Sequence, residues 1–292
     1  MHFSIRGNNM AEKTNIIPTQ TPTYKPSARI KVNLSGTAET MLQSFYARAK
    51  YSNNKGHKFY DSKAVEIVEK IDYDFSLAEG DSTMSDGVIA RTLVFDELVK
   101  NFISENPNCT VVNIACGLDT RFYRMDNGRL KWINLDLPEI IDIRNEIFDE
   151  PERILNIGCS VLDASWVKNI DACEKVLFII EGLSMYLTKN ENAKMLEIIR
   201  KNFSGATVML ECLAKRWINR EKIEKSIHKT GARFIFGADC FEDIADIAGG
   251  FRKIKDDNIT RGMIALHPVL RLFEKLPFVD KISEKILIFE SE

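Results

Sequence analysis

This chain of 292 residues lacks several features that would each point to a class of protein. Its purely apolar runs reach only about five or six residues, whereas a helix needs about 18 to cross a bilayer. Basic and acidic residues are nearly balanced, at 40 and 42, so no positive excess favours a nucleic-acid partner. We therefore expect a soluble cytoplasmic protein that spans no membrane and binds no nucleic acid.

Paired cysteines and clustered histidines are also missing. The six cysteines include no C-x-x-C pair, and the four histidines have no metal-site spacing. A disulfide framework and a structural or catalytic metal are both unexpected on these grounds. Cys116, Cys159 and Cys212 lie in or beside predicted buried strands, where a free thiol acts as a small apolar side chain.

The most informative segment that is present runs from Val111 to Arg121. Its β-branched start predicts a buried parallel strand, and Gly117 allows a tight turn after it. A second apolar run ends at Asp136, 19 residues after Gly117. A carboxylate at the end of that strand can accept hydrogen bonds from both hydroxyls of a ribose. The pair predicts a nucleoside pocket.

Glycine is scarce in this turn. A dinucleotide-binding fingerprint requires G-x-G-x-x-G, but the chain places Ala115, Gly117 and Thr120 at the three glycine positions. A diphosphate would lose its usual close approach to the backbone. The segment therefore favours S-adenosylmethionine, which has no phosphate, over a nicotinamide dinucleotide.

The pattern of apolar residues predicts an α/β fold. Strands are expected near 110–115, 131–136, 154–159, 176–181 and 206–212, alternating with helices such as Pro138–Phe148 and Glu191–Phe203. Two later strand-like segments, Arg252–Lys255 and Lys285–Phe289, would close the sheet with one strand antiparallel. The prediction is a doubly wound, mostly parallel sheet of seven strands.

The remaining segments define the expected domain organisation. Residues 1–33 are proline-containing and polar, which predicts a mobile leader. Residues 34–292 would form a single domain. Its parts are a helical cap (34–106), with helices at Thr40–Arg48, Ser62–Ile71 and Val88–Ile103, a cofactor-binding half (107–212), a lid insertion (213–250) and closing strands (251–292).

Several motifs, in order along the chain, carry a resemblance to a known family. The chain resembles the leucine carboxyl methyltransferase superfamily, and within it the tetracenomycin-type polyketide O-methyltransferases. The similar segments are Tyr46–Lys50, Ile71–Phe75, Arg91 with Phe95–Glu97, Cys116–Arg121, Asp136–Glu139, Ser160–Asp163 with Trp166, and Glu181–Leu187. The resemblance implies a Rossmann-like class I methyltransferase fold and S-adenosylmethionine as the cofactor.

It also implies roles for particular residues. Basic residues of the N-terminal helices, here Arg91 and less clearly Arg48, would hold the methionine carboxylate, which suits the forked guanidinium. Gly117 would give the close backbone approach and Asp136 would bind the ribose. The adenine would lie by Leu162 and Asp163, and the ammonium group by Glu181.

Ala115 departs from the family pattern, because relatives usually carry glycine there. A positive φ would strain the turn by about 1 kcal/mol, whereas a negative φ would make alanine harmless. We expect the negative φ, since alanine leaves the backbone nearly as accessible.

No residue is assigned as catalytic base. A carboxylate acceptor is already ionised at neutral pH and needs none, whereas a phenol or alcohol would benefit from one. Tyr186 and His228 are weak candidates. Phe234, Phe236 and Phe241 suit either a planar or apolar acceptor or a role in the core.

The sequence thus predicts an S-adenosylmethionine-dependent O-methyltransferase acting on a carboxylate or hydroxyl of a small, polyketide-like acceptor. The alternatives are methylation of a protein C-terminal carboxylate, a non-catalytic binder of the same cofactor, and a nicotinamide-dependent oxidoreductase. The oligomeric state stays open.

Overall fold

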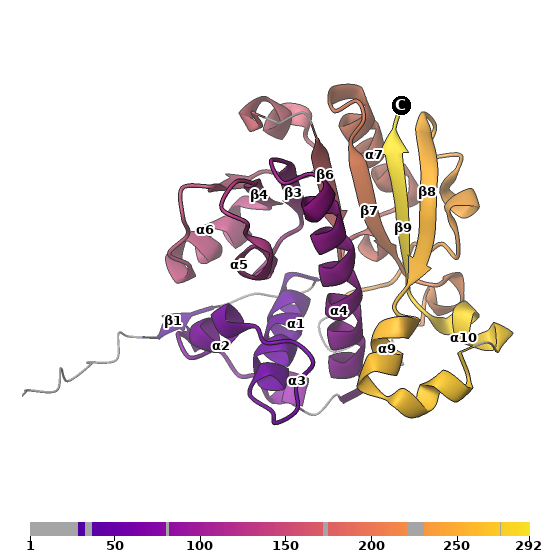
Figure 1. The fold of residues 1–292 in the computed structure, drawn as a ribbon. Coiled ribbons are helices and arrows are strands. Elements are labelled where there is room, and N and C mark those ends of the chain that lie inside the picture. The colour runs from indigo at the N-terminus through magenta and orange to yellow at the C-terminus, as the bar shows by residue number, and fades with distance from the viewer. Residues whose placement is uncertain (1–28, 33–36, 80–81, 172–174, 221–230, 275) are drawn as a thin grey trace, which may run out of the picture.

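A twisted seven-stranded sheet forms the centre of the molecule (Figure 1). The computed structural model describes residues 29–32, 37–79, 82–171, 175–220, 231–274 and 276–292. The strand order is β5-β4-β3-β6-β7-β9-β8. The strands are β3 (Thr110–Ile114), β4 (Lys131–Asp136), β5 (Ile154–Gly158), β6 (Val176–Ile180), β7 (Thr207–Cys212), β8 (Phe251–Asn258) and β9 (Lys285–Ser291).

The first five strands are parallel, and β9 runs antiparallel between β7 and β8. Strands β3, β6 and β7 are buried along their whole length, as a parallel strand covered on both faces must be. Their apolar, β-branched sequences make this burial favourable. The predicted fold class, the five central strands and the closing antiparallel strand are confirmed.

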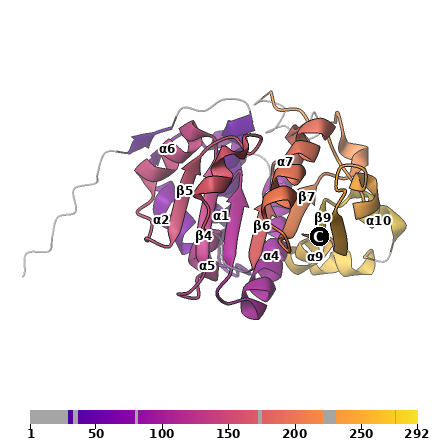
Figure 2. The same cartoon turned by 90° about the horizontal axis from the view of Figure 1, so that it is seen from above.

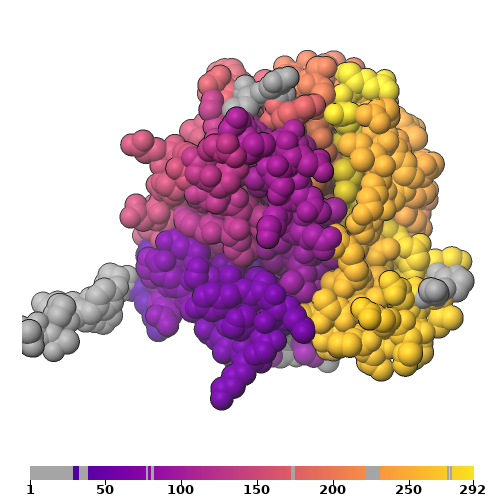
Figure 3. Space-filling model, in the orientation of Figure 1, coloured from indigo at the N-terminus to yellow at the C-terminus, as the bar shows by residue number. Residues whose placement is uncertain are grey.

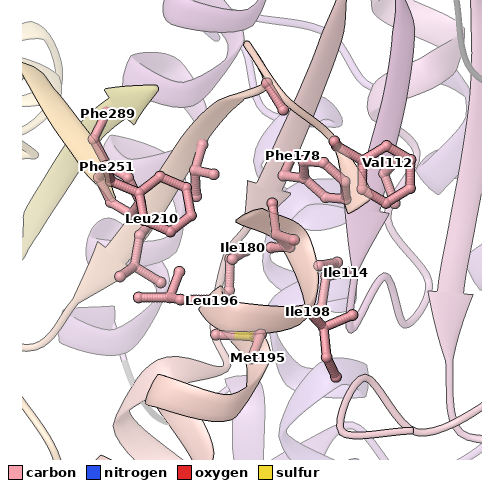
Figure 4. Close-up of a cluster of buried hydrophobic side chains, with 14 of the residues drawn as sticks. Val112, Ile114, Phe178, Ile180, Met195, Leu196, Ile198, Leu210, Phe251 and Phe289 are labelled. Atoms are coloured by element: carbon pink, nitrogen blue, oxygen red, sulfur yellow. The ribbon is translucent and has the colours of Figure 1, made fainter. Parts of the chain in front are cut away.

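Helices cover both faces of the sheet (Figure 2). On one face, α4 (Ser82–Glu105) packs against Val111, Leu177 and Met209 of the strands. On the other face, α7 (Lys189–Asn202) supplies Met195 and Leu196 to a cluster with alternate strand residues. Figure 4 shows Leu196 and Met195 below Ile180, and Ile198 of the same helix beside Ile114. Alternation along each strand therefore divides the core into two layers.

The other elements between β3 and β7 are short. Pro138 at the first turn of α6 fits the position where a missing N–H is harmless, and a capping box of Thr188 and Glu191 begins α7. The short elements are α5 (Arg121–Met125), α6 (Pro138–Ile147) and the 3₁₀ helices η1 (Ala164–Asn169) and η2 (Ser184–Tyr186), and a further 3₁₀ helix, η3 (Lys215–Trp217), follows β7.

The N-terminal helices lie beside α4, below the sheet in Figure 1. α1 (Thr37–Ser52) contacts α2 (Ser62–Val68), α3 (Ser76–Glu79) and α4. Two short strands, β1 (Ile30–Lys31) and β2 (Ile71–Asp72), pair in parallel.

Several boundaries differ from the sequence expectations there: α1 extends over Thr37–Ser52 and not only Thr40–Arg48, and α4 begins at Ser82 and not at Val88. Ile71 belongs to a strand and not to the preceding helix, because its pairing with Ile30 supplies hydrogen bonds that a further helical turn would not. Ile30–Lys31 falls inside the predicted leader, yet it forms a strand of the two-stranded β1–β2 sheet. Residues 1–28 of that leader lie outside the described residues.

The C-terminal part closes one edge of the sheet. Its elements are η5 (Phe241–Ile244), α9 (Thr260–Leu266), η6 (Pro268–Leu272) and α10 (Pro277–Ile282), together with β8 and β9. α9 packs on α4, so segments far apart in the sequence lie side by side on the face seen in Figure 3. Among the described residues, no helix combines the length and apolarity needed to span a bilayer.

Candidate functional site

A cavity of about 380 Å³ lies where the parallel strands end. Its wall includes residues that directly follow β3, β5, β6 and β7, together with the last residues of β4. The carboxyl ends of parallel strands are where α/β sheets bind ligands. We distinguish two parts of the wall by the elements that supply them. The turn side consists of Ala115–Asp119, Asp136, Leu137 and Leu162. The helix side comes from α1 and α4 and consists of Thr40, Gln43, Ser44, Arg48, Thr83, Met84, Gly87, Val88 and Arg91.

The turn after β3 is left-handed at two positions. Gly117 has a φ of 47°, which suits a residue without a Cβ, but Ala115 has a φ of 53°. The expectation of a negative φ at Ala115 is therefore wrong. The chain must reverse between β3 and α5 within a few residues, and this geometry overrides the preference of alanine. The result is local strain of about 1 kcal/mol in the cavity wall.

Asp136 is tied to this turn. Its Oδ2 accepts a hydrogen bond from the Gly117 N–H and its Oδ1 one from the Leu137 N–H, both at 2.8 Å. Burial raises the pKa of Asp136, and the two backbone donors oppose that shift. Each carboxylate oxygen has more than one acceptor position, so both can accept a further hydroxyl from the cavity.

Arg144 of α6 holds the same turn from beneath. Its Nη1 donates to the carbonyl oxygens of Gly117 and Asp119, each at 2.9 Å. Its Nε and Nη2 donate to Glu150 at 3.0 and 2.6 Å. The side chain is fully buried, and sequence reasoning missed it. The turn side is thus held in place by charged hydrogen bonds that do not involve a ligand.

On the helix side, Arg91 is enclosed by acids. Its Nε lies 2.9 Å from Glu181 Oε1, and its Nη1 donates to Glu211 Oε1 at 3.0 Å. Glu181 also accepts from the buried Arg121, at 2.7 Å. The structure therefore brings Arg91 and Glu181 together in the cavity wall, as the two residues predicted to meet opposite charges of one ligand.

Glu211 was not expected at the site. Its Oε2 accepts from the Gly182 N–H at 2.6 Å, and it shares a hydrogen bond with Glu284, which lines the cavity. Burial, opposed by Arg91 and reinforced by the Glu284 and Glu181 carboxylates, raises the pKa of Glu211 to about 8. Because its pKa is raised, Glu211 keeps its proton to a higher pH than an exposed glutamic acid does.

Arg48 of α1 is less available than Arg91. Its Nη2 donates to the Leu118 carbonyl at 3.3 Å, and its Nε lies 3.4 Å from the buried Asp61 carboxylate. It lines the cavity and binds the turn through the Leu118 carbonyl. Its predicted contact with the methionine carboxylate stays a prediction.

Of the two residues predicted to flank the adenine, only one lines the cavity as described. Leu162 lines the cavity. Asp163 is exposed and absent from the wall as described, and its carboxylate accepts from the Ser165 N–H at 2.9 Å, which caps η1. Its predicted contact with the ring amine stays untested.

Of the two weak catalytic candidates, only Tyr186 lies among the described residues. Tyr186 lines the cavity beside Phe234, with ring centroids 5.7 Å apart. His228 lies outside the described residues. Of the three phenylalanines, Phe234 alone lines the cavity as described, whereas Phe236 belongs to the core and Phe241 packs on Phe289.

Gln43 is a further residue that sequence reasoning missed. It lines the cavity and is 2% exposed. Within the described residues, neither its Oε1 nor its Nε2 has a hydrogen-bond partner. A buried amide without partners is rare in folded proteins.

These groups fit an adenosyl sulfonium compound. Asp136 offers free acceptor positions to a ribose, Leu162 an apolar surface, Glu181 a carboxylate and Arg91 a guanidinium, all around one cavity. In the described part of the chain, no group of three His, Cys, Asp or Glu side chains is arranged to hold a metal.

Comparisons with known proteins agree with this chemistry. Residues 38–200 match the family model described as leucine carboxyl methyltransferase. The tetracenomycin polyketide synthesis O-methyltransferase of Streptomyces glaucescens is 30% identical over 207 residues, covering 70% of this chain and 77% of that protein. An S-adenosyl-L-methionine-dependent methyltransferase of Gibberella zeae is 33% identical over 195 residues, covering 61% and 65%.

Solved structures are similar in fold. A proposed methyltransferase of Thermobifida fusca superposes with a TM-score of 0.57 at 11% identity, covering 88% of this chain and 95% of that one. A DUF574 family protein of Streptomyces avermitilis gives a TM-score of 0.55 at 8% identity, covering 85% and 97%. At such low identity these matches support the fold alone.

Proposed function

This chain belongs to the leucine carboxyl methyltransferase family and is an S-adenosylmethionine-dependent methyltransferase, and from that premise we propose that it methylates an oxygen of a small, polyketide-like organic acceptor. The observation that carries the proposal is the single cavity in which the turn side and the helix side face each other. A nucleoside-binding wall and a second, partly polar wall suit two ligands that react together.

The size and lining of the cavity support a small acceptor. Outside the turn side, the cavity has an apolar and aromatic region formed by Met185, Tyr186, Leu213 and Phe234. Such a region suits a planar or apolar body. The relative from Streptomyces glaucescens acts in polyketide synthesis, as its name states, and this favours an acceptor of that kind here.

We propose the following contacts for the cofactor. Asp136 accepts from the ribose hydroxyls, and Leu162 and Asp163 flank the adenine. Glu181 binds the ammonium group, and Arg91 binds the carboxylate together with Arg48. Gly117 allows the backbone to approach closely.

The cofactor supplies a methyl group on a positively charged sulfur, which an oxygen nucleophile attacks in line. The protein aligns the acceptor and excludes water, since α1 and α4 cover the cavity. Cys116 is no nucleophile in this scheme, because burial raises the pKa of its thiol well above the ordinary value. We assign no catalytic base.

The decisive experiment follows a labelled methyl group. Purified protein with labelled S-adenosylmethionine is incubated with a small-metabolite extract and, separately, with a protein extract. We expect label in small molecules. Label only in protein would favour the C-terminal carboxyl methyltransferase, and no label despite tight cofactor binding would favour the inert binder.

Calorimetry provides the matching binding test. S-Adenosylhomocysteine should bind and NAD should not. Heat from NAD alone would favour the oxidoreductase and contradict the cofactor assignment.

The cellular location is part of the same proposal. The five described cysteines are all free thiols, which is usual in the reducing cytoplasm. Fractionation of the source cells should find the protein there.

A further inference from the structure

Gln43 has no structural explanation within the fold. Both polar atoms of its amide are buried and unpaired among the described residues, and the side chain lines the cavity. We propose that Gln43 recognises the methyl acceptor, through an acceptor group that both donates and accepts a hydrogen bond. This inference deepens the proposed function and rests on it.

The fold alone would favour an apolar residue at this position. The neighbouring Leu42 and Phe45 of α1 pack in an apolar cluster with α2, and Ala47, one turn after Gln43, packs with Met84 and Val88 of α4. A buried amide without partners loses its hydration and gains nothing in return. Methionine has nearly the same length and helix propensity and would carry no such cost.

The cofactor has partners elsewhere in the cavity. Its ribose, ammonium and carboxylate groups are matched by Asp136, Glu181 and Arg91 under the proposed function. The Gln43 amide remains for the second ligand. Its stretch of the wall continues over Thr83 and Gly87 of α4, and a Cβ added at Gly87 would meet no atom within 4 Å. There is open space for a group beside α4.

The chemistry of an amide restricts what that group can be. A carboxamide presents an N–H donor and a carbonyl acceptor side by side. A carboxylate or a simple ketone only accepts hydrogen bonds and would leave the glutamine carbonyl unpaired. A hydroxyl beside a carbonyl, or a carboxamide, satisfies both atoms. Both atoms are unpaired, so exchanging the amide oxygen and nitrogen positions leaves the same donor and acceptor without partners.

Pairing with both the donor and the acceptor of the Gln43 amide restricts which class of compound can be the methyl acceptor. A small carboxylate acid is disfavoured, and a hydroxylated carbonyl compound is favoured. In the reaction, the acceptor oxygen forms a bond to the methyl carbon as the carbon–sulfur bond breaks, and the hydroxyl proton leaves to solvent.

The test uses the substitution Gln43→Met, with Leu42→Met as a control at the preceding residue of the same helix. If Gln43 is unpaired in the free protein, Gln43→Met should raise the Tm by about 2 to 4 °C. It should leave the affinity for S-adenosylhomocysteine unchanged. Leu42→Met should not raise the Tm.

The acceptor part of the test uses two neutral probes of the same shape. 2-Naphthamide offers both a donor and an acceptor, and 2-acetylnaphthalene only an acceptor. With wild-type protein saturated in S-adenosylhomocysteine, we expect the amide to bind about tenfold more tightly. Gln43→Met should remove the difference, and Leu42→Met should keep it.

Several outcomes would overturn the inference. A lower Tm for Gln43→Met would mean that the amide has a structural partner. Weaker binding of S-adenosylhomocysteine would assign Gln43 to the cofactor. Equal probe affinities in the wild type, including no binding of either, would remove the acceptor role. A wild-type protein that binds no S-adenosylhomocysteine would overturn the proposed function itself.

Discussion

The turn side and the helix side of the cavity differ in how completely their polar groups are paired. On the turn side, Asp136 and Arg144 satisfy the backbone of residues 117–119 without any ligand. On the helix side, the buried amide of Gln43 has no partner among the described residues. Preorganised groups lower the cost of ordering on binding. The comparison indicates a turn side that is ready in advance and, at Gln43 on the helix side, a polar group that a ligand completes.

The largest expected effect tests the support of the turn side. Arg144→Met removes four hydrogen bonds and leaves Glu150, which is nearly buried, without its cation. We expect the free energy of unfolding to fall by about 3–5 kcal/mol, measured by chemical denaturation. Arg153→Met is the control, because the Arg153–Asp126 pair is partly exposed and should contribute less than about 1 kcal/mol. Equal losses would show that Arg144 does not support the turn.

The next prediction concerns Glu211, which pairs with Arg91 of the helix side. It is faced by Arg91 from α4, Glu181 after β6 and Glu284 before β9. Since its pKa is raised from 4.5 to about 8 in the folded protein, its protonation contributes stability that is complete below pH 4.5 and is lost as the pH rises to about 8. Glu211→Gln mimics the protonated acid.

Over pH 5–8, the stability of the wild type should therefore fall relative to that of Glu211→Gln, by about 3–4 kcal/mol. Denaturation at several pH values measures this. Glu197→Gln, on the exposed face of α7, should follow the wild type. Parallel curves for wild type and Glu211→Gln would contradict the raised pKa.

A smaller effect tests the ribose contact. Asp136→Asn should weaken S-adenosylhomocysteine binding by about 1–3 kcal/mol, which is roughly a tenfold to hundredfold change in Kd. The amide loses one acceptor and faces a backbone donor. Calorimetry measures the affinity, with Asp171→Asn as an exposed control. Unchanged affinity would remove Asp136 from the site.

The smallest effect concerns strain on the turn side. Ala115→Gly should stabilise the protein by about 1 kcal/mol, because glycine adopts the observed φ of 53° without a steric cost. Gly205→Ala, at a φ of 71°, should destabilise by a similar amount. A loss of stability in Ala115→Gly would show that the alanine methyl group contributes packing that outweighs the strain.

Much of the fold followed from local pattern. Runs such as Val176–Ile180 are apolar at every position, as two-sided burial requires, and each was predicted within a residue or two. The short strands β1 and β2 were missed, because two residues contain no periodicity. Their pairing depends on contacts between segments about 40 residues apart in the sequence.

Part of the site could also be predicted from local sequence pattern. Asp136 and Glu181 are acids at strand ends, and both line the cavity. Glu211 has this same position in β7 and could have been found by that rule. Arg144 falls on the buried stripe of α6 with Ile140, Ile141 and Ile147, so an arginine at a core position was its indication. The φ of Ala115 and the unpaired state of Gln43 depend on tertiary geometry and have no local pattern.

The position of β9 has a consequence for synthesis of the chain. This strand lies between β7 and β8, although both precede it in the sequence. A nascent chain that has not yet extruded residues 285–291 exposes an open edge on β7 and has no partner strand for β8 among the described strands. Open edges invite intermolecular pairing. Emergence of β9 from the ribosome therefore closes the β7 edge and gives β8 its partner, which removes this route to aggregation.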